Sequence, residues 1–436
     1  MNSERFYIES AQQFFDAGTL DVTIKGWVHH RRSSGKIKFL VIRDGTGFMQ
    51  AVLVKGECSD AAWEDFEKLT QESALTITGT LKQNPRQPGV FELGVRELKI
   101  YSIAQEYPIS PKEHGIEFLM ENRHLWLRSK RQHAAVRVRA EIIKSIRSFF
   151  DEQNFVLFDA PILTPSSCEG TSNLFETPYF DTKAYLTQSG QLYGEVGAMA
   201  HGKVYVFGPT FRAEKSKTRK HLTEFWMVEP EVAWADLDDN MILAERLVEY
   251  VVQSVLDKRA AELQTLERDV KKLEMIKGPF PRISYTEAVK VLERRGCGVP
   301  WGEDFGAPQE TALGDEFNGM PVFIHHFPAA IKAFYFKRDA QNDELALGCD
   351  LIAPDGYGEV IGGGQREDDL ALLEKRVAEH QLDLTDYQWY LDLRRFGSVP
   401  HAGFGLGVER TVAWICGLDH VRESIPFPRL LHTLRP

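Results

Sequence analysis

The chain has 436 residues, of which 43% are hydrophobic and 26% charged, and its formal net charge at pH 7 is −11. This composition excludes a disordered or fibrous protein, and the length favours two or three domains. The acidic balance also excludes a protein that coats nucleic acid with a uniformly basic surface, although it is compatible with a local basic patch.

Targeting and redox features of the sequence predict a cytoplasmic protein. No run of 18 apolar residues occurs, so no membrane-spanning helix is expected, and the first residues lack the basic and then apolar pattern of a secretory signal. The five cysteines are widely spaced and include no C-x-x-C pair. This distribution argues against a disulfide framework or a cysteine-based zinc site and suits a reducing compartment.

Short strand-like segments fill residues 20–103. Apolar and polar residues alternate from Val22 to Val28, and two apolar-rich runs, 37–43 and 48–54, flank the turn signal Asp44-Gly45. A polar, helix-like stretch and further strands over 74–81 and 91–100 follow. This pattern predicts a closed barrel of the OB type as a first domain over residues 1–103, with a small open sheet as the alternative.

The rest of the chain predicts a linker and one α+β domain. Residues 104–125 contain two prolines and a glycine, which is typical of a linker, and no comparable boundary interrupts residues 126–436. Apolar residues at helical spacing predict a helix over 137–150, and residues 240–274 are expected to form one long amphipathic helix or two. The expected strands are 203–214, 224–234, 331–337, 346–352 and 359–362. Because these strands come in clusters, they favour an antiparallel sheet flanked by helices.

The densest cationic segment is RAEKSKTRKH, residues 212–221, which lies between two expected strands. Five lysines and arginines stand there against one glutamate. At the tip of a hairpin such charges repel one another unless an anion lies among them, and a polyphosphate is the obvious candidate. The alternative is an ordinary solvated loop.

A glycine-rich segment, GFGLGVER at residues 403–410, leads into an apolar, helix-like stretch. Alternate glycines let a backbone approach a ligand closely, and the start of a helix together with Arg410 would attract an anion. The segment fits neither the P-loop pattern nor the dinucleotide-binding pattern, so a different nucleotide site is expected.

Two acidic residues, Asp350 and Glu359, lie on neighbouring expected strands joined by a Pro-Asp-Gly turn. A hairpin there would bring both carboxylates together, and paired acids beside a polyphosphate suit Mg²⁺. The alternative is one surface acid and one capping acid.

Three segments in this order resemble the signature motifs of class II aminoacyl-tRNA synthetases: FDAPILTP at 158–165, FRAE at 211–214 and GFGLGVER at 403–410. The preceding barrel fits the aspartyl/asparaginyl/lysyl subgroup. The stretches HLTEFWMVEPE, GEVIGGGQRE and GSVPHAGFGLGVER are similar to those of the asparaginyl-tRNA synthetases. The resemblance covers nearly the whole chain. It implies ATP-dependent attachment of asparagine to tRNA(Asn) through an asparaginyl-adenylate, with release of AMP and pyrophosphate.

The resemblance also implies roles in ATP binding. Arg212 would hold the α-phosphate and the substrate carboxylate, Phe225 and Arg410 would enclose the adenine, and Glu214 would contact ATP from the adenine side. Arg212, Glu214 and Arg410 are the expected catalytic residues. Further ATP contacts are expected from Arg219, His221, Glu359 and Gly407, and Mg²⁺ ligands from Asp350 and Glu359.

The amino-acid pocket implied by the resemblance discriminates asparagine from aspartate. Its expected residues are Glu169, Ser189, Gln191, Arg212, Glu229 and Arg366. Aspartyl enzymes carry a lysine three residues after the glutamine that corresponds to Gln191, whereas this chain has Gly194. A missing cation weakens the binding of a carboxylate more than that of an amide, so asparagine is expected. Arg366 would donate to the amide oxygen, and Glu229 would accept from the amide nitrogen.

The barrel is expected to bind the anticodon of tRNA(Asn) through Arg32, Phe39 and Gln50. Phe39 would stack on the middle base and Gln50 would read its edge, beside a basic edge that also includes Arg31, Lys36 and Lys38. A Phe39 in the barrel core is the alternative. The motif that contains Pro161 forms an interface in this family and implies a homodimer.

Three other functions compete with this interpretation. One is an aspartyl-tRNA synthetase, with or without discrimination between the two tRNAs. Another is an asparagine synthetase-like paralogue, which the presence of the barrel disfavours. The third is a non-catalytic RNA-binding protein, which would be expected to lose some of the five motif residues Arg212, Glu214, Asp350, Glu359 and Arg410. All five are present.

Overall fold

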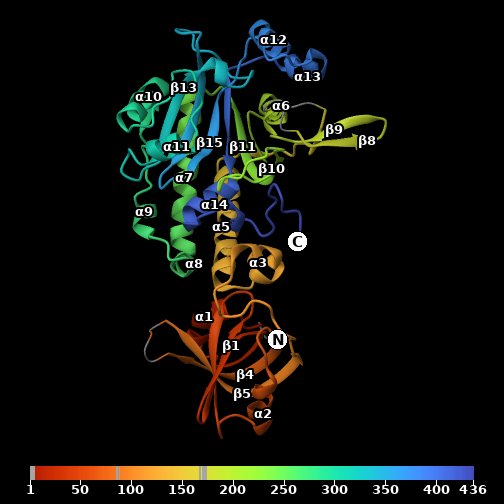
Figure 1. Ribbon diagram of the computed structural model, residues 1–436, viewed down its shortest axis with the longest axis vertical. Helices are drawn as coiled ribbons and strands as arrows, with labels where there is room; N and C mark the ends of the chain where they lie inside the picture. The colour runs from red at the N-terminus through yellow and green to blue at the C-terminus, as the bar shows by residue number, and fades with distance from the viewer. Residues whose placement is uncertain (1–4, 85–86, 88, 166–167, 169–173) are drawn as a thin grey trace. The chain divides into compact units, whose positions relative to one another are not determined.

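The computed structural model describes residues 5–436 except for 85–86, 88, 166–167 and 169–173. The chain divides into two compact units, Met1–Gly115 and Ile116–Pro436 (Figure 1). The division falls inside the segment 104–125, for which a linker is predicted. Within the described residues, none of the helices has the length and apolar character needed to cross a lipid bilayer.

The first unit is a closed barrel, as the sequence predicts. Its strands are β1 (Asp21–Ser34), β2 (Ile37–Arg43), β3 (Phe48–Val54), β4 (Ala74–Gln83) and β5 (Phe91–Ser102), paired in the order β1-β2-β3-β5-β4. Pairing of β1 with β4 closes the barrel, and β3 runs parallel to β5. Helix α2 (Asp60–Lys68) connects β3 to β4, and a short helix α1 (Ala11–Asp16) precedes the barrel.

The second unit is built on a mixed sheet with the strand order β12-β13-β14-β15-β16-β11-β10-β6. Neighbours from β13 to β10 are antiparallel, which confirms the predicted antiparallel sheet, whereas β12 and β6 join its two edges in parallel. The strands are β6 (Val156–Leu157), β10 (Lys203–Phe211), β11 (Glu224–Ala233), β12 (Arg282–Ser284), β13 (Val322–Pro328), β14 (Leu345–Ala353), β15 (Gly358–Gln365) and β16 (His401–Gly407). A smaller sheet pairs β7 (Leu163–Thr164), β9 (Thr182–Leu186) and β8 (Glu176–Tyr179).

One predicted strand, 331–337, is wrong. The chain forms a short 3-10 helix (Ala329–Ile331) and turns there, and the strand of this region is β13. Phe334, Tyr335 and Phe336 are buried in a separate apolar cluster that also contains Tyr387 and Tyr390. Their apolar pattern therefore reflects burial in that cluster and not pairing in a sheet.

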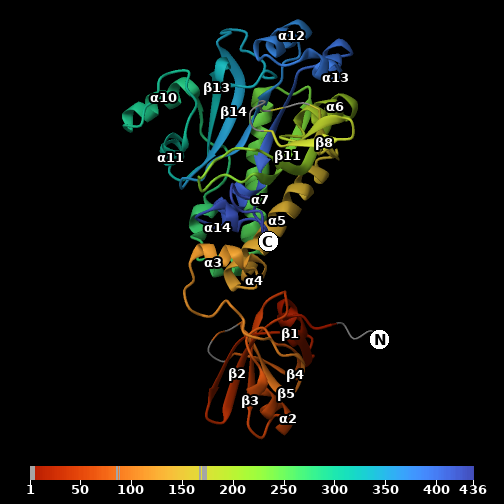
Figure 2. The ribbon, with the colours of Figure 1, turned by 45° about the vertical axis from the view of Figure 1, so that its right-hand side comes forward.

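Long helices cover one face of the sheet. Helix α7 (Leu237–Lys258) packs on β14, β15 and β16, α14 (Val408–Cys416) packs on β11, and α5 (Lys130–Glu152) packs on both helices (Figure 2). The segment 240–274, for which one or two helices are predicted, is covered by three: α7, α8 (Ala260–Thr265) and α9 (Val270–Glu274). The other helices are α3 (Ile116–Glu121), α4 (Arg123–Trp126), α6 (Gln191–His201), α10 (Tyr285–Arg294), α11 (Ala307–Gly314), α12 (Leu370–Glu379) and α13 (Leu384–Arg395).

Strand alternation divides β11 and β16 into a core face and a cleft face. Val228, Phe404 and Leu406 lie in the apolar core formed with the helices. Their neighbours in sequence point the other way, and on β16 these neighbours are glycines. A Cβ atom at Gly403 would overlap Glu231. Glycine is therefore required at this position so that an acidic side chain of β11 can lie across β16.

Candidate active site

Two adjoining pockets, with empty volumes of about 660 and 1270 Å³, lie over the cleft face of the sheet. Both are lined by Arg212, Lys220, His221, Glu359 and Arg410, so together they form one cleft. The residues expected to bind ATP and Mg²⁺ all line one or both pockets: Arg212, Glu214, Arg219, His221, Phe225, Asp350, Glu359, Gly407 and Arg410. Residues spread over almost 200 positions of sequence are thus brought together.

The smaller pocket combines an aromatic ring, cations and open backbone. Phe225 of β11 lines it, and the Arg212 guanidinium carbon lies 5.5 Å from the centre of the Phe225 ring. Gly407 ends β16 in the same pocket, and a Cβ atom there would meet no other atom within 4 Å. The pocket can therefore accept a flat ring that stacks on Phe225, and the edge of this ring can come close to the backbone at Gly407.

The larger pocket contains the two predicted acids. A Cβ atom placed on Gly362 would lie 2.7 Å from Glu359 Oε1 and 3.5 Å from Asp350 Oδ1, so both carboxylates lie over this glycine. Burial, together with the nearby charge of Asp350, raises the pKa of Glu359 to about 7, and burial also raises the pKa of Asp350. Such a pair of hard oxygen donors gains from a cation between them.

Lys332 supplies a positive charge at this pair, and sequence reasoning missed it. Its Nζ atom lies 2.9 and 2.8 Å from the two carboxylate oxygens of Asp350 and 3.8 Å from the centre of the Phe327 ring. Burial lowers the pKa of Lys332, but the carboxylates of Asp350 and Glu359 outweigh it, and the net shift is upward. Lys332 therefore stays charged and partly neutralises the acids.

The cationic segment 212–221 forms the loop between the antiparallel strands β10 and β11, as expected. Several contacts anchor this loop. Lys220 Nζ lies 3.0 Å from Glu310 Oε2 of α11, and the backbone carbonyl of Arg219 accepts a hydrogen bond from Val421 N at 3.0 Å. Burial, followed by the charge of Arg410, lowers the pKa of His221. The loop is thus part of the cleft wall and differs from a freely solvated loop.

Arg410 projects from the first turn of α14 into the cleft. Its guanidinium donates to the backbone carbonyl of Glu359 and, at 3.5 Å, to that of Lys220. The preceding Glu409 accepts a hydrogen bond from Trp226 N at 2.9 Å and pairs with Arg139 of α5 at 2.7 Å. These bonds tie the start of α14 to β11 and to α5, which fixes the direction of Arg410.

The expected amino-acid residues gather beside the cleft, on the continuation of β11. Ser189 Oγ donates a hydrogen bond to Glu229, and Gly190 N donates to the same carboxylate at 2.8 Å. Gln191 follows at the start of α6. Glu169, the remaining member of the expected pocket, lies outside the described residues.

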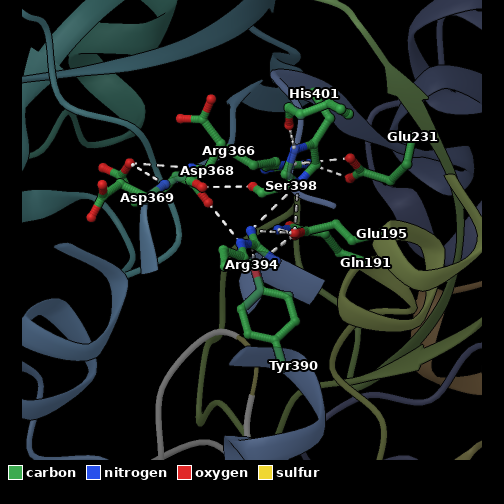
Figure 3. A network of polar contacts seen from close by, with 12 residues as sticks. Gln191, Glu195, Glu231, Arg366, Asp368, Asp369, Tyr390, Arg394, Ser398 and His401 are labelled. Carbon is green, nitrogen blue, oxygen red and sulfur yellow. Dashed lines mark hydrogen bonds and ion pairs between the residues drawn. The ribbon is translucent and has the colours of Figure 1, made fainter. Parts of the chain in front are cut away.

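Arg366 forms a fully buried ion pair with Glu231, a residue that the sequence interpretation did not include (Figure 3). Arg366 Nη2 lies 2.5 Å from Glu231 Oε1, and Nε lies 3.3 Å from Oε2. Burial raises the pKa of Glu231, whereas the guanidinium of Arg366, bonded to both of its carboxylate oxygens, lowers this pKa and favours the charged form. The position of Gly194 faces this pair, since a Cβ atom there would lie 3.2 Å from Glu231 Cγ. The sequence did contain a signal for Glu231, because Glu229 and Glu231 alternate along one strand and therefore point to the same face of the sheet.

On the barrel, the three expected anticodon residues share the outer surface. Phe39 is only partly buried and alternates with the core residues Leu40 and Ile42, which excludes it from the barrel core. The Arg32 guanidinium lies 4.2 Å from the centre of the Phe39 ring. Gln50, on the neighbouring strand β3, donates to Glu92 at 3.2 Å.

The expected basic edge is only partly formed. Lys38 is 5% exposed, donates to the Trp63 carbonyl at 2.7 Å and lies over the ring of Trp63. Arg31 donates to the Phe66 carbonyl at 3.2 Å. Both residues therefore turn toward α2 and away from the face of Phe39, because successive residues of a strand point to opposite sides.

Comparisons with known proteins agree with this geometry. The family model "tRNA synthetases class II (D, K and N)" matches residues 115–431, and the model "OB-fold nucleic acid binding domain" matches residues 22–101. An asparagine–tRNA ligase of Desulforamulus reducens is 58% identical over 416 residues, which cover 95% of this chain and 96% of the relative.

Two solved structures are similar over nearly their full length. Asparaginyl-tRNA synthetase from Pyrococcus horikoshii, complexed with asparaginyl-adenylate, has a TM-score of 0.91 at 44% identity, with coverage of 95% of this chain and 96% of that one. The Entamoeba histolytica asparaginyl-tRNA synthetase, also in complex with asparaginyl-adenylate, has a TM-score of 0.86 at 32% identity and the same coverage.

Proposed function

Because the chain belongs to the asparagine–tRNA ligases, which are class II aminoacyl-tRNA synthetases, we propose that it activates asparagine with ATP in the cleft and transfers it to tRNA(Asn). The observation that carries this proposal is the assembly of Arg212, Phe225, Glu359 and Arg410 around one cleft beside the buried Arg366–Glu231 pair. A cytoplasmic location, expected from the cysteine pattern, belongs to the same proposal.

ATP is proposed to bind across both pockets. The adenine lies against Phe225, with Arg410 on its other side and Glu214 at its edge, and Gly407 allows its close approach. The α-phosphate lies at Arg212, and Arg219 and His221 face the outer phosphates. Without ATP, burial and the charge of Arg410 lower the pKa of His221.

The proposed reaction is an attack of the asparagine carboxylate on the α-phosphorus, with pyrophosphate as the leaving group. A carboxylate is already a nucleophile, so the site needs no general base. The cations Arg212 and Arg410 lower the repulsion between the two anionic reactants and hold them in line. The terminal ribose hydroxyl of tRNA(Asn) then takes the acyl group, and AMP leaves.

Asp350 and Glu359 are proposed to hold Mg²⁺. The donor set fits, because two carboxylates whose pKa values are raised lie together over a glycine. When bound, Mg²⁺ would neutralise phosphate charge and orient the outer phosphates. Lys332 competes for Asp350, so the site is expected to favour Mg²⁺ that arrives with ATP.

Selection of asparagine is proposed to follow from charge balance. The positive charge of Arg366 is already matched by Glu231, and Gly194 adds no second cation. A neutral amide therefore enters without leaving a charge unpaired, whereas an aspartate carboxylate would meet no free cation there. Glu229 is proposed to accept from the amide nitrogen and Arg366 to donate to the amide oxygen.

The partners are proposed to be tRNA(Asn) and a second copy of the chain. Phe39, Arg32 and Gln50 form the proposed anticodon contacts. Apolar side chains of the first signature motif and its neighbours are well exposed, with exposed fractions of 42% for Val156, 44% for Ile162 and 43% for Leu163. Contact with a second copy would bury this surface.

ATP–pyrophosphate exchange tests the proposal. Exchange should depend on asparagine, with aspartate far weaker, both with and without tRNA. Equal exchange with aspartate would favour an aspartyl enzyme, release of free asparagine from aspartate and ammonia would favour the synthetase-like paralogue, and no exchange would favour a non-catalytic RNA-binding protein. Arg212→Ala should abolish exchange, whereas the exposed control Arg246→Ala should retain it.

A further inference from the structure

A fully buried polar cluster lies behind the proposed amino-acid pocket, centred on Glu195 of α6 (Figure 3). The Glu195 carboxylate accepts hydrogen bonds from Arg394 at 2.7 Å, Tyr390 at 2.8 Å and His401 at 2.9 Å. Although burial opposes ionisation, Arg394 and His401 hold the pKa of Glu195 well below its usual range. Glu195 is therefore a fixed anion.

The donors to Glu195 are themselves held in place. Arg394 Nε donates to the backbone carbonyl of Glu367 at 2.8 Å, and His401 Nδ1 lies 2.8 Å from the carbonyl of Val399. These bonds connect α13, β16 and the segment after β15. The carboxylate consequently has little freedom to rotate.

A further donor to Glu195 is the side chain of Gln191, one helical turn earlier. Gln191 Nε2 donates to Glu195 Oε1 at 3.1 Å, and Gln191 N donates to Ser189 Oγ at 3.0 Å. In the described part of the chain, Gln191 Oε1 accepts no hydrogen bond. A primary amide has one donor end and one acceptor end, so its oxygen faces away from Glu195.

The cluster therefore selects one of the two orientations of the Gln191 amide. In the reverse orientation the amide oxygen would face a carboxylate oxygen about 3 Å away, which is repulsive, and the charge-assisted hydrogen bond would be lost.

We propose that Glu195 is a positioning residue that keeps the carbonyl oxygen of Gln191 facing the α-ammonium group of asparagine. The inference rests on the proposed function, which places Gln191 in the amino-acid pocket. The α-ammonium is the one cationic group of asparagine, and it only donates hydrogen bonds. If the Gln191 amide were flipped, its NH₂ group would face the α-ammonium group. Both groups donate hydrogen bonds, so binding of the amino acid would weaken.

The test compares asparagine with succinamic acid, which is asparagine without its amino group. Glu195→Asp keeps the negative charge for Arg394 but withdraws the carboxylate from Gln191. In this variant the KM for asparagine in ATP–pyrophosphate exchange should rise on the order of 10- to 100-fold, while the inhibition constant of succinamic acid changes less than about twofold. The KM for ATP should stay at the wild-type value.

Equal losses for asparagine and succinamic acid would show that Glu195 only supports the fold, and an unchanged KM for asparagine would likewise overturn the inference. The wild-type protein in the same assay tests the proposed function separately from the role of Glu195. If the wild-type protein shows no asparagine-dependent exchange, the proposed function is refuted, and the inference about Glu195 is refuted with it.

Two further variants make the test independent of the folding of Glu195→Asp. The double variant Gln191→Glu/Glu195→Gln exchanges the two groups and again turns an oxygen toward the ammonium, so it should recover most of the affinity that Glu195→Gln loses. No recovery would contradict the proposal. Arg395→Ala serves as the control: this exposed residue of α13 contacts Gln388, Asp392 and Glu374 and should keep the wild-type KM.

Discussion

The buried pair between Arg366 and Glu231 offers a direct test of how the pocket tells an amide from a carboxylate. Replacement of Glu231 by glutamine keeps the shape of the side chain but removes its charge. Arg366, only 1% exposed, would then be a buried cation whose principal partner is neutral. We expect two consequences, one for stability and one for selectivity.

The loss of stability can be worked from the contacts. Removal of one partner from a buried, hydrogen-bonded ion pair costs about 3–5 kcal/mol, because the other charge remains uncompensated. The surface pair Lys68–Asp65, at 2.7 Å, serves as the matched control, and its loss in Asp65→Asn should cost about 0–1 kcal/mol. Urea unfolding of both variants measures this difference.

The change in selectivity follows from the same charge. In Glu231→Gln, the carboxylate of aspartate can pair with the free charge of Arg366, a charge-assisted bond worth about 1.5–3 kcal/mol. The ratio of kcat/KM for asparagine to that for aspartate in pyrophosphate exchange should fall by roughly 10- to 100-fold. If the variant loses stability but keeps the wild-type ratio, the charge balance at Arg366 does not determine the choice of amino acid.

Three further predictions address the anticodon face, the metal site and acid stability. Phe39→Ala should raise the KM for tRNA by roughly 5- to 100-fold, because stacking of a base on an aromatic ring is worth about 1–3 kcal/mol, and should leave tRNA-independent exchange intact. The control variant Phe39→Trp keeps an aromatic ring and should bind tRNA normally. A normal KM for Phe39→Ala would contradict the anticodon assignment. In the absence of ATP, Lys332→Met should bind Mg²⁺ more tightly, so that a lower Mg²⁺ concentration is enough to raise its melting temperature. An unchanged concentration would show that Lys332 does not compete for Asp350. Burial, with Arg422 and Arg219 nearby, lowers the pKa of His420 to about 4, so its contribution to stability is present above pH 6.5 and is lost as the pH falls toward 4. His420→Asn keeps an acceptor for Arg422 N, and its melting temperature should fall less between pH 6.5 and pH 4. If the melting temperature of this variant falls with pH as steeply as that of the wild type, His420 is not the source of the acid sensitivity.

Local sequence patterns were sufficient for the barrel and for the order of the motifs. Strands 37–43 and 48–54 coincide with β2 and β3 because apolar alternation and the Asp44-Gly45 turn are both local signals. The pairing of the two cleft acids followed from a hairpin, which is also local. The resemblance to class II synthetases then specified how distant segments meet.

Partners that are distant in sequence could not be predicted. Glu231 meets Arg366 across 135 residues, and Glu195 meets Arg394 across 199. Each acid is neutralised by a residue that the local pattern does not indicate. The direction of Lys38 escaped prediction for the same reason, because the aromatic rings that it covers belong to α2, 25 or more residues later.

The most direct test of the account is a crystal structure of the protein with a non-hydrolysable asparaginyl-adenylate analogue. We expect the adenine ring on Phe225 and the group that replaces the α-phosphate at Arg212. We also expect the side-chain amide between Glu229 and Arg366 and the ammonium group at Gln191 Oε1. An analogue bound elsewhere, with Arg212 and Arg410 turned to solvent, would contradict the proposed function.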